Sequence, residues 1–215
     1  MAQDKRETIF KMPPGTKSHN RMSNSAKSRR VREQLADRSV VLIGLMGAGK
    51  TAIGRRLATR LKLEFIDADT EIECAAGKSI ADIFTDHGED HFRDGERKVI
   101  ARLLGSGPQI LATGGGAYMN EETRGAIAQY SISVWLKGDL KVLMERVVRR
   151  DHRPLLKTSD PEAVMKRLMD ERYPVYASAD ITVQSRDVPH EVIVTEIMEA
   201  LFERLESGSG ENVKM

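Results

Sequence analysis

The sequence predicts an α/β domain in which a mostly parallel sheet has helices on both faces. Five short apolar runs alternate along the chain with longer amphipathic segments, and short runs of this kind are typical of strands buried within a parallel sheet. The first run leads directly into a glycine-rich loop and then into a helix. Strands and helices that alternate in this order favour a parallel sheet covered on both faces.

The chain length favours a single compact domain with a polar segment at each end. The 215 residues have a mass of 24.0 kDa, which suits one domain. Residues 1–38 contain ten Lys and Arg against four Asp and Glu, with almost no apolar periodicity, and this predicts a disordered basic arm. Three roles stay open for the arm: a solvated extension, an organelle transit peptide or a polyanion-binding tail. We expect the domain at residues 39–206 and a flexible tail at residues 207–215.

The first half of the domain begins with a strand at residues 40–43, where Val, Val, Leu and Ile follow one another. Residues 50–62 form an amphipathic helix, because apolar residues recur at intervals of four while basic residues occupy the other faces. A second short strand follows at residues 63–66.

Capping signals mark most of the later helices. Ser79 and Asp82 begin a helix that Gly88 would end, and a longer helix follows at residues 89–104. Further helices begin at Asn120, Asp139 and Asp160-Pro161. The other strands are predicted at residues 109–113, 132–136 and 181–183, and the last helix at residues 192–205.

Composition excludes several classes of protein. The one cysteine, Cys74, cannot form an intrachain disulfide, and no Cys and His residues have the spacing of a structural zinc site. No uncharged apolar run approaches the roughly 18 residues that cross a bilayer. We therefore expect no membrane segment and a reducing, cytoplasmic location.

The most specific motif is G-L-M-G-A-G-K-T at residues 44–51, between a predicted strand and a predicted helix. In this context it is a phosphate-binding loop (P-loop), whose glycines let backbone N–H groups converge on phosphates at the helix N-terminus. Lys50 then reaches the β- and γ-phosphates, and Thr51 binds Mg²⁺. A GTPase would also need D-x-x-G and N-K-x-D patterns, and neither occurs. The motif predicts nucleotide binding but leaves open whether water or a second substrate accepts the phosphoryl group.

Two carboxylates indicate where an acceptor would lie. Asp67 and Asp69 follow the second predicted strand, at the carboxyl edge of the sheet where open α/β folds bind ligands. One could serve Mg²⁺ through water while the other accepts or orients an acceptor hydroxyl. Guanidinium groups suit a carboxylate or a transferring phosphoryl group, so an anionic acceptor is favoured by Arg93, Arg153 and Arg172. The run Gly114-Gly115-Gly116 would let the backbone approach that acceptor closely.

Together these motifs resemble the shikimate kinase family over residues 39–205. The matching elements are Gly44-x-x-Gly47-x-Gly49-Lys50-Thr51, Asp67-x-Asp69, Phe92-Arg93-x-x-Glu96, Gly114-Gly115-Gly116, Arg153-Pro154-Leu155-Leu156, and Arg172 with Tyr176. The resemblance implies phosphoryl transfer from MgATP to the 3-hydroxyl of shikimate, a step of aromatic amino-acid biosynthesis. It also implies a three-layer P-loop kinase fold, with a five-stranded parallel sheet in the order 2-3-1-4-5 and a mobile lid at residues 149–160.

The resemblance further implies a role for each matching residue. Asp69 would bind the shikimate hydroxyls and act as the base or orienting acceptor. Arg93 and Arg172 would hold the carboxylate, and Gly115, between Gly114 and Gly116, would add backbone contacts. Thr51 would ligate Mg²⁺ and Asp67 would hold the metal through water, while Arg153 on the lid would reach the transferring phosphate. The implied ATP contacts are Gly47, Ala48, Gly49, Lys50, Thr51, Ala52, the adenine-stacking Arg146, Arg153, and Arg186 from the loop after the fifth strand.

The expected partners are the small molecules shikimate and ATP, with Mg²⁺ as the cofactor, and we expect a monomer that binds no nucleic acid. Two other functions stay open. One is a related small-molecule kinase, such as one that acts on gluconate. The other is a nucleotide-dependent regulatory protein in which the arm contacts nucleic acid and the core has lost transfer activity.

Overall fold

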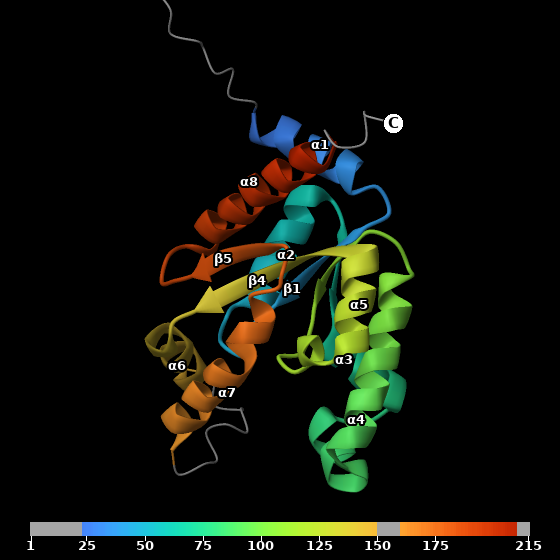
Figure 1. The fold of residues 1–215 in the computed structure, drawn as a ribbon, viewed down its shortest axis with the longest axis vertical. Helices are drawn as coiled ribbons and strands as arrows, with labels where there is room; N and C mark the ends of the chain where they lie inside the picture. The colour runs from blue at the N-terminus through green and yellow to red at the C-terminus, as the bar shows by residue number, and fades with distance from the viewer. Residues whose placement is uncertain (1–22, 150–159, 210–215) are drawn as a thin grey trace, which may run out of the picture.

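The computed structural model describes residues 23–149 and 160–209, which form a five-stranded sheet with helices on both sides (Figure 1). All the strands run parallel, in the order β2-β3-β1-β4-β5. This confirms the predicted fold class and strand order. The strands are β1 (Ser39–Ile43), β2 (Glu64–Asp67), β3 (Gln109–Ala112), β4 (Ser131–Gly138) and β5 (Ile181–Ser185).

Helices α2 (Lys50–Leu61) and α8 (His190–Ser209) pack together on one side of the sheet, and α1 (Asn24–Leu35) packs against both. On the other side α5 (Glu121–Tyr130) lies against β4, with α4 (Ile80–Leu104) beside it. The elements that begin where β2, β3 and β4 end are α3 (Ala68–Ala76), the short 3-10 helix η1 (Ala117–Met119) and α6 (Leu140–Val148). Helix α7 (Pro161–Tyr176) packs against α6 and η1.

Strand β1 lies at the centre of the sheet, and all five of its residues are buried. It pairs with β3 on one side and β4 on the other, so that Leu42 lies opposite both Ala112 and Val134. A strand covered on both faces must be apolar throughout, which is why residues 40–43 form an unbroken apolar run. The loop after β1 therefore leaves the middle of the carboxyl edge, at the switch point where ligands bind in open α/β sheets.

Helix α4 is kinked at Gly88, where the sequence predicts that one helix ends and a longer one follows. The Ser79 side chain accepts a hydrogen bond from the Asp82 N–H group at 3.1 Å and so caps α4 as expected. Gly88 then adopts φ 82° and ψ 176°, which are not helical. The predicted boundary at Gly88 is therefore confirmed as a kink that separates two helical segments of α4.

The prediction of a disordered arm is wrong for residues 24–35, which form α1. Val31 and Leu35 of this helix are fully buried. Lys27 pairs with Glu199 of α8 at 2.5 Å, and Arg30 pairs with Glu206 at 2.6 Å. Two apolar residues four apart are too weak a signal for a helix by themselves, and α8 supplies the surface that buries them. Residues 1–22 of the predicted arm lie outside the described residues.

The C-terminal boundary of the domain also differs from the prediction. Helix α8 continues past residue 206 to Ser209, and residues 210–215 of the predicted tail lie outside the described residues.

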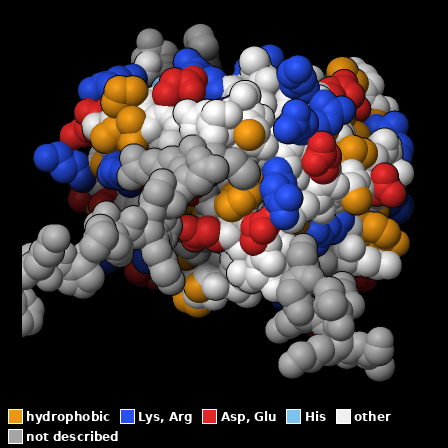
Figure 2. Space-filling view, turned by 90° about the horizontal axis from the view of Figure 1, so that it is seen from above, with side chains coloured by type: hydrophobic (Ala, Val, Ile, Leu, Met, Phe, Trp, Pro, Cys, Tyr) orange, Lys and Arg blue, Asp and Glu red, His pale blue; other side chains and the backbone are white. Residues whose placement is uncertain are grey.

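Seen from above, the face near α1 and α8 carries interspersed basic and acidic side chains (Figure 2). Among the described residues, no helix combines the length and the apolar character needed to span a membrane.

Candidate active site

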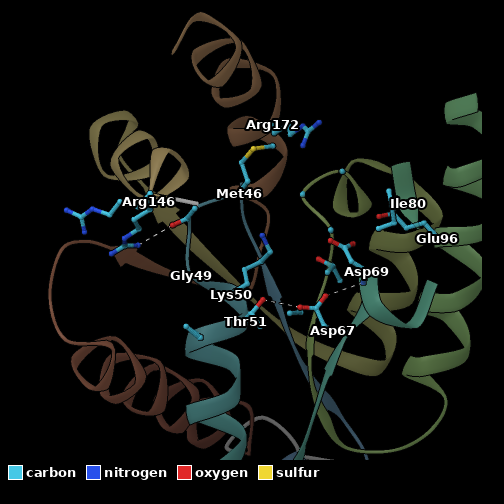
Figure 3. A pocket seen from close by; sticks show the side chains of 18 of the residues that line it. Met46, Gly49, Lys50, Thr51, Asp67, Asp69, Ile80, Glu96, Arg146 and Arg172 are labelled. Atoms are coloured by element: carbon cyan, nitrogen blue, oxygen red, sulfur yellow. Dashed lines mark hydrogen bonds between the residues drawn. The ribbon is translucent and has the colours of Figure 1, made fainter. Parts of the chain in front are cut away.

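One cavity of about 640 Å³ at the carboxyl edge of the sheet collects most of the predicted site residues (Figure 3). The P-loop lies between its two ends: a nucleotide end near Arg146 and an acceptor end near Asp69 and Arg172. The predicted residues that line the cavity are Gly47, Gly49, Lys50, Thr51, Ala52, Asp67, Asp69, Arg93, Gly114, Gly115, Gly116, Arg146 and Arg172. Residues far apart in the sequence thus meet in one place, as the motif set predicts.

The P-loop conformation depends on glycine at positions 47 and 49. Gly47 and Gly49 have φ values of 82° and 93°, which side chains other than glycine rarely adopt. Gly49 precedes α2 and contributes no side-chain cap, so the N-terminal N–H groups of α2 face the cavity as an anion site. The Lys50 ammonium lies across the loop and donates to the Gly44 carbonyl at 2.7 Å and the Leu45 carbonyl at 3.2 Å. This geometry suits a chain of phosphates.

The two aspartates are connected to the P-loop through a short hydrogen-bond chain (Figure 3). The Thr51 hydroxyl donates to Asp67 Oδ2 at 3.0 Å. The other oxygen of Asp67 accepts from the Asp69 N–H group at 3.2 Å and caps α3. Asp67 is therefore fixed beside Thr51, and Asp69 stands in the first turn of α3 with its side chain on the cavity wall.

Each glycine of the triple run lies against a different charged group of the acceptor end. A Cβ atom on Gly114 would lie 2.8 Å from Asp69 Oδ1 and 2.8 Å from Glu96 Oε1. On Gly115 it would lie 3.2 Å from Arg172 Nη1, and on Gly116 it would overlap the Arg93 guanidinium. None of these glycines has a positive φ. They are required for space, which lets charged side chains from α3, α4 and α7 converge on one backbone segment.

Glu96 organises the arginine at this end of the cavity. Only 3% of Glu96 is exposed, and its Oε2 accepts from Arg93 Nη1 at 2.7 Å. Arg93 Nη2 also donates to Glu89 at 3.0 Å. Burial raises the pKa of the Glu96 carboxyl, and the Arg93 guanidinium offsets this only in part. Within the described residues, Glu96 Oε1 has no hydrogen-bond partner.

Tyr176 connects α7 to the glycine run. Its side chain is completely buried, and its hydroxyl donates to the Gly115 carbonyl. Burial raises the pKa of this phenol, so it stays protonated and remains a donor. Because Arg172 lies one turn earlier on α7, the same helix fixes both an arginine and a backbone segment of the acceptor end.

At the nucleotide end, Arg146 and Arg186 are placed differently. Arg146 lines the cavity. The Arg186 side chain is absent from the described lining and pairs instead with Glu196 of α8, at 3.1 Å for Nη1 and Oε2. The loop that carries Arg186 does reach the cavity, through Asp187 and Val188. The predicted loop therefore lines the cavity, and the predicted Arg186 side chain is directed to α8.

Other predicted residues lie elsewhere, and some lining residues were missed. Ala48 is fully buried within the P-loop, and Arg153 with nearly all of the predicted lid lies outside the described residues. Glu96 belongs to a matching motif, but no site role was predicted for it. Its i, i+3 spacing from Arg93 on a helix could have indicated that the two side chains pair. The remaining lining residues were not predicted as site residues, although Met46 and Phe92 belong to the motifs and Arg149 begins the predicted lid. Among them are Met46, Ile80, Phe84, Phe92, Arg149 and His190.

Comparison with known proteins agrees with this arrangement. The family model described as shikimate kinase matches residues 46–202. A shikimate kinase of Bradyrhizobium diazoefficiens is 62% identical over 167 residues, which cover 78% of this chain and 81% of that protein. The solved structure of a shikimate kinase from Acinetobacter baumannii in complex with shikimate is 33% identical, with a TM-score of 0.76 over 80% of this chain and 97% of that one.

A gluconokinase from Sinorhizobium meliloti 1021 is similar in fold alone, at 19% identity and a TM-score of 0.57 over 81% of this chain and 97% of that one. The shikimate kinase match covers most of the chain. The P-loop also faces two aspartates and two arginines in one cavity. The chain belongs to the shikimate kinase family and is a phosphotransferase of that family.

Proposed function

We propose that the protein transfers the γ-phosphoryl group of ATP to the 3-hydroxyl of shikimate, which yields shikimate 3-phosphate for aromatic amino-acid biosynthesis. One observation carries the proposal: the P-loop and the charged acceptor end line the same cavity. A phosphoryl group held by the loop can then pass directly to a hydroxyl held near Asp69, and little covalent chemistry is required of the protein beyond positioning and charge stabilisation.

At the acceptor end, Asp69 binds the hydroxyl groups of shikimate and orients the 3-hydroxyl or accepts its proton. Arg93 and Arg172 hold the carboxylate, because a guanidinium group binds a carboxylate through two parallel hydrogen bonds. The contact of Gly115 with Arg172 and of Gly116 with Arg93 supports this role, since each arginine lies directly against the backbone. Backbone groups of Gly114, Gly115 and Gly116 complete the acceptor site.

At the nucleotide end, Lys50 and the N–H groups of the P-loop hold the phosphates, and Arg146 stacks on the adenine. The residues beside the loop fit Mg²⁺, because Thr51 and Asp67 offer hard oxygen donors whose side-chain oxygens lie 3.0 Å apart. Thr51 would ligate the metal and Asp67 would hold it through water. When bound, Mg²⁺ neutralises charge on the phosphates. Arg153, outside the described residues, is proposed to stabilise the transferring phosphoryl group.

We also propose that the protein acts as a cytoplasmic monomer. The single cysteine suits a reducing compartment. Light scattering of the purified full-length chain measures the oligomeric state directly, and a stable dimer would overturn this part of the proposal.

The proposed reaction is tested by ADP release from MgATP with shikimate, with gluconate, and with no acceptor. We expect release that depends on shikimate. Release with gluconate alone would overturn the acceptor, and bound nucleotide with no release would favour a regulatory protein. Asp69→Asn should abolish turnover and leave ADP binding unchanged, because Asp69 lies at the acceptor end. Loss of ADP binding in this variant would contradict the assigned role.

A further inference from the structure

A buried serine lies behind the nucleotide end of the cavity. Ser185 is the last residue of β5, where it pairs with Gly138 of β4, and only 1% of it is exposed. It does not line the cavity and lies behind Arg146, to which it is hydrogen-bonded. A buried hydroxyl that lacked partners would be unfavourable, and the partners of Ser185 show what the hydroxyl does.

The Ser185 hydroxyl joins the P-loop to Arg146. It donates to the Ala48 carbonyl at 2.9 Å and accepts from Arg146 Nη1 at 2.8 Å. The Arg146 guanidinium also donates to the Gly47 carbonyl at 3.3 Å and, through Nη2, to the Arg186 carbonyl at 2.7 Å. One guanidinium thus contacts the P-loop, the end of β5 and the loop after it.

This set of contacts fixes the plane of the guanidinium. A guanidinium group is planar, and its donors point in fixed directions. Three acceptors, the Gly47 and Arg186 carbonyls and the Ser185 hydroxyl, therefore hold it in one orientation. The hydroxyl of Ser185 holds the middle of the arrangement, because it bonds to Arg146 and to the P-loop at once. A flat group held in this way can bind a flat partner without the loss of side-chain freedom that a mobile arginine would undergo.

From this geometry we infer that Ser185 is a positioning residue for the nucleotide: its hydroxyl holds the Arg146 guanidinium against the P-loop in the orientation that receives the base. The inference rests on the proposed nucleotide site. Ser185 would act without contacting the nucleotide. Its replacement should change nucleotide affinity and leave the acceptor end unchanged, because Ser185 does not approach that end.

Another buried serine provides a matched control. Ser133 of β4 is 2% exposed, and its hydroxyl donates to Asp180 at 2.7 Å. It resembles Ser185 in burial and in the loss expected on replacement by alanine, although β4 is an inner strand of the sheet and β5 an edge strand. It differs because neither it nor Asp180 lines the cavity. An effect on structure alone should therefore be similar in Ser133→Ala and Ser185→Ala.

The test compares Ser185→Ala, Ser185→Thr and Ser133→Ala with the wild-type chain by ADP titration calorimetry, thermal denaturation and steady-state kinetics. Because the bond acts on the nucleotide only through Arg146, the effect expected is that of one ordinary hydrogen bond, an increase of about five- to tenfold in the ADP Kd and the ATP KM of Ser185→Ala. The shikimate KM and kcat should stay within about twofold of wild type. Ser185→Thr keeps the hydroxyl and should restore ADP affinity, and Ser133→Ala should lower the Tm without changing the ADP Kd.

A double-mutant cycle identifies Arg146 as the group through which Ser185 acts. In an Arg146→Ala chain, adding Ser185→Ala should weaken ADP binding by less than about threefold, because the two residues are coupled. Equal ADP affinity of Ser185→Ala and wild type, a parallel rise in both KM values, or full additivity in the cycle would each overturn the inference. Failure of the wild-type chain to bind ADP would instead overturn the proposed nucleotide site, and the inference with it.

Discussion

Gly114→Ala is expected to remove most of the activity while the fold is retained. A Cβ atom at this position would lie 2.8 Å from Asp69 Oδ1 and 2.8 Å from Glu96 Oε1, whereas ordinary contact begins at 3.4 Å. Each carboxylate oxygen must therefore move away by about 0.6 Å, because repulsion rises steeply inside the contact distance. Both atoms end flexible side chains, so the backbone has little reason to move. The displaced group is nevertheless the carboxylate proposed to orient the acceptor hydroxyl.

The size of the effect follows from this displacement. A shift of about 1 Å in a reacting group can lower the rate about 100-fold. For a shift of about 0.6 Å we expect kcat to fall about 10- to 30-fold, which corresponds to about 1.4 to 2 kcal/mol of transition-state stabilisation. Gly114 does not have a positive φ, so alanine also reduces the conformational freedom of the unfolded chain. The Tm should therefore be unchanged or slightly higher.

Coupled ADP release with saturating substrates measures kcat, and calorimetry with ADP reports on the nucleotide end. The matched control is Gly125→Ala on α5, where a Cβ atom would meet nothing within 4 Å; activity should stay at the wild-type level and the Tm should rise. A Gly114→Ala chain with kcat within twofold of wild type would refute the reasoning. So would a fall in ADP affinity as large as the fall in kcat.

Three further predictions concern the acceptor end and the N-terminal helix. Tyr176→Phe removes the donor to the Gly115 carbonyl and should raise the shikimate KM about three- to tenfold with the ATP KM unchanged. The control Tyr173→Phe loses a donor to the Gly138 carbonyl and should leave the shikimate KM unchanged. Equal effects of the two substitutions on the shikimate KM would contradict this prediction. Burial raises the pKa of Glu96 above its ordinary value of 4.5, so the folded chain binds more protons than the unfolded chain in the window above 4.5. The free energy of unfolding should therefore fall as pH rises through that window, and urea titrations of Glu96→Gln should lack this component; identical pH profiles would exclude it. Deletion of residues 1–37 removes the buried Val31 and Leu35 and should lower the free energy of unfolding by about 3 kcal/mol. At low temperature, kcat and both KM values should stay within about twofold of wild type. An unchanged Tm would show that α1 contributes nothing to stability.

The sequence was most informative where chemistry and local structure impose the same residues. The P-loop needs a strand before it, a helix after it, and Lys50 and Thr51 at fixed positions, so both fold class and nucleotide binding could be predicted from it. Asp67 and Asp69 could be placed at the carboxyl edge because they follow a strand. The motifs also brought Arg172 into the site, although spacing alone could not show that it lies against Gly115.

Features that local sequence could not specify depend on contacts with distant segments. Arg186 follows a strand that ends at the site, but Glu196 on α8 holds its side chain elsewhere. Helix α1 carries only two buried apolar residues, and its stability comes from packing on α8, at the other end of the chain. Ser185 gives no signal in the sequence, because a serine at the end of a strand is ordinary until its two partners are known. In each case the position of the side chain or helix depends on a partner in another part of the chain. The local sequence pattern does not specify how that partner packs.

The two glycine-rich segments of the site need glycine for different physical reasons, and substitution should separate these reasons. Gly49 has φ 93°, so Gly49→Ala strains the backbone by about 1 to 2 kcal/mol whatever space surrounds it; both the Tm and ADP affinity should fall. Gly116 has no positive φ, but a Cβ atom there would overlap the guanidinium of Arg93, so Gly116→Ala should weaken shikimate binding while the Tm and ADP affinity are retained. Thermal denaturation with separate ADP and shikimate titrations distinguishes the two patterns. If both variants lost stability equally, the triple-glycine run would be a turn of special backbone conformation, and its proposed purpose, to let three charged side chains converge on the acceptor, would be wrong.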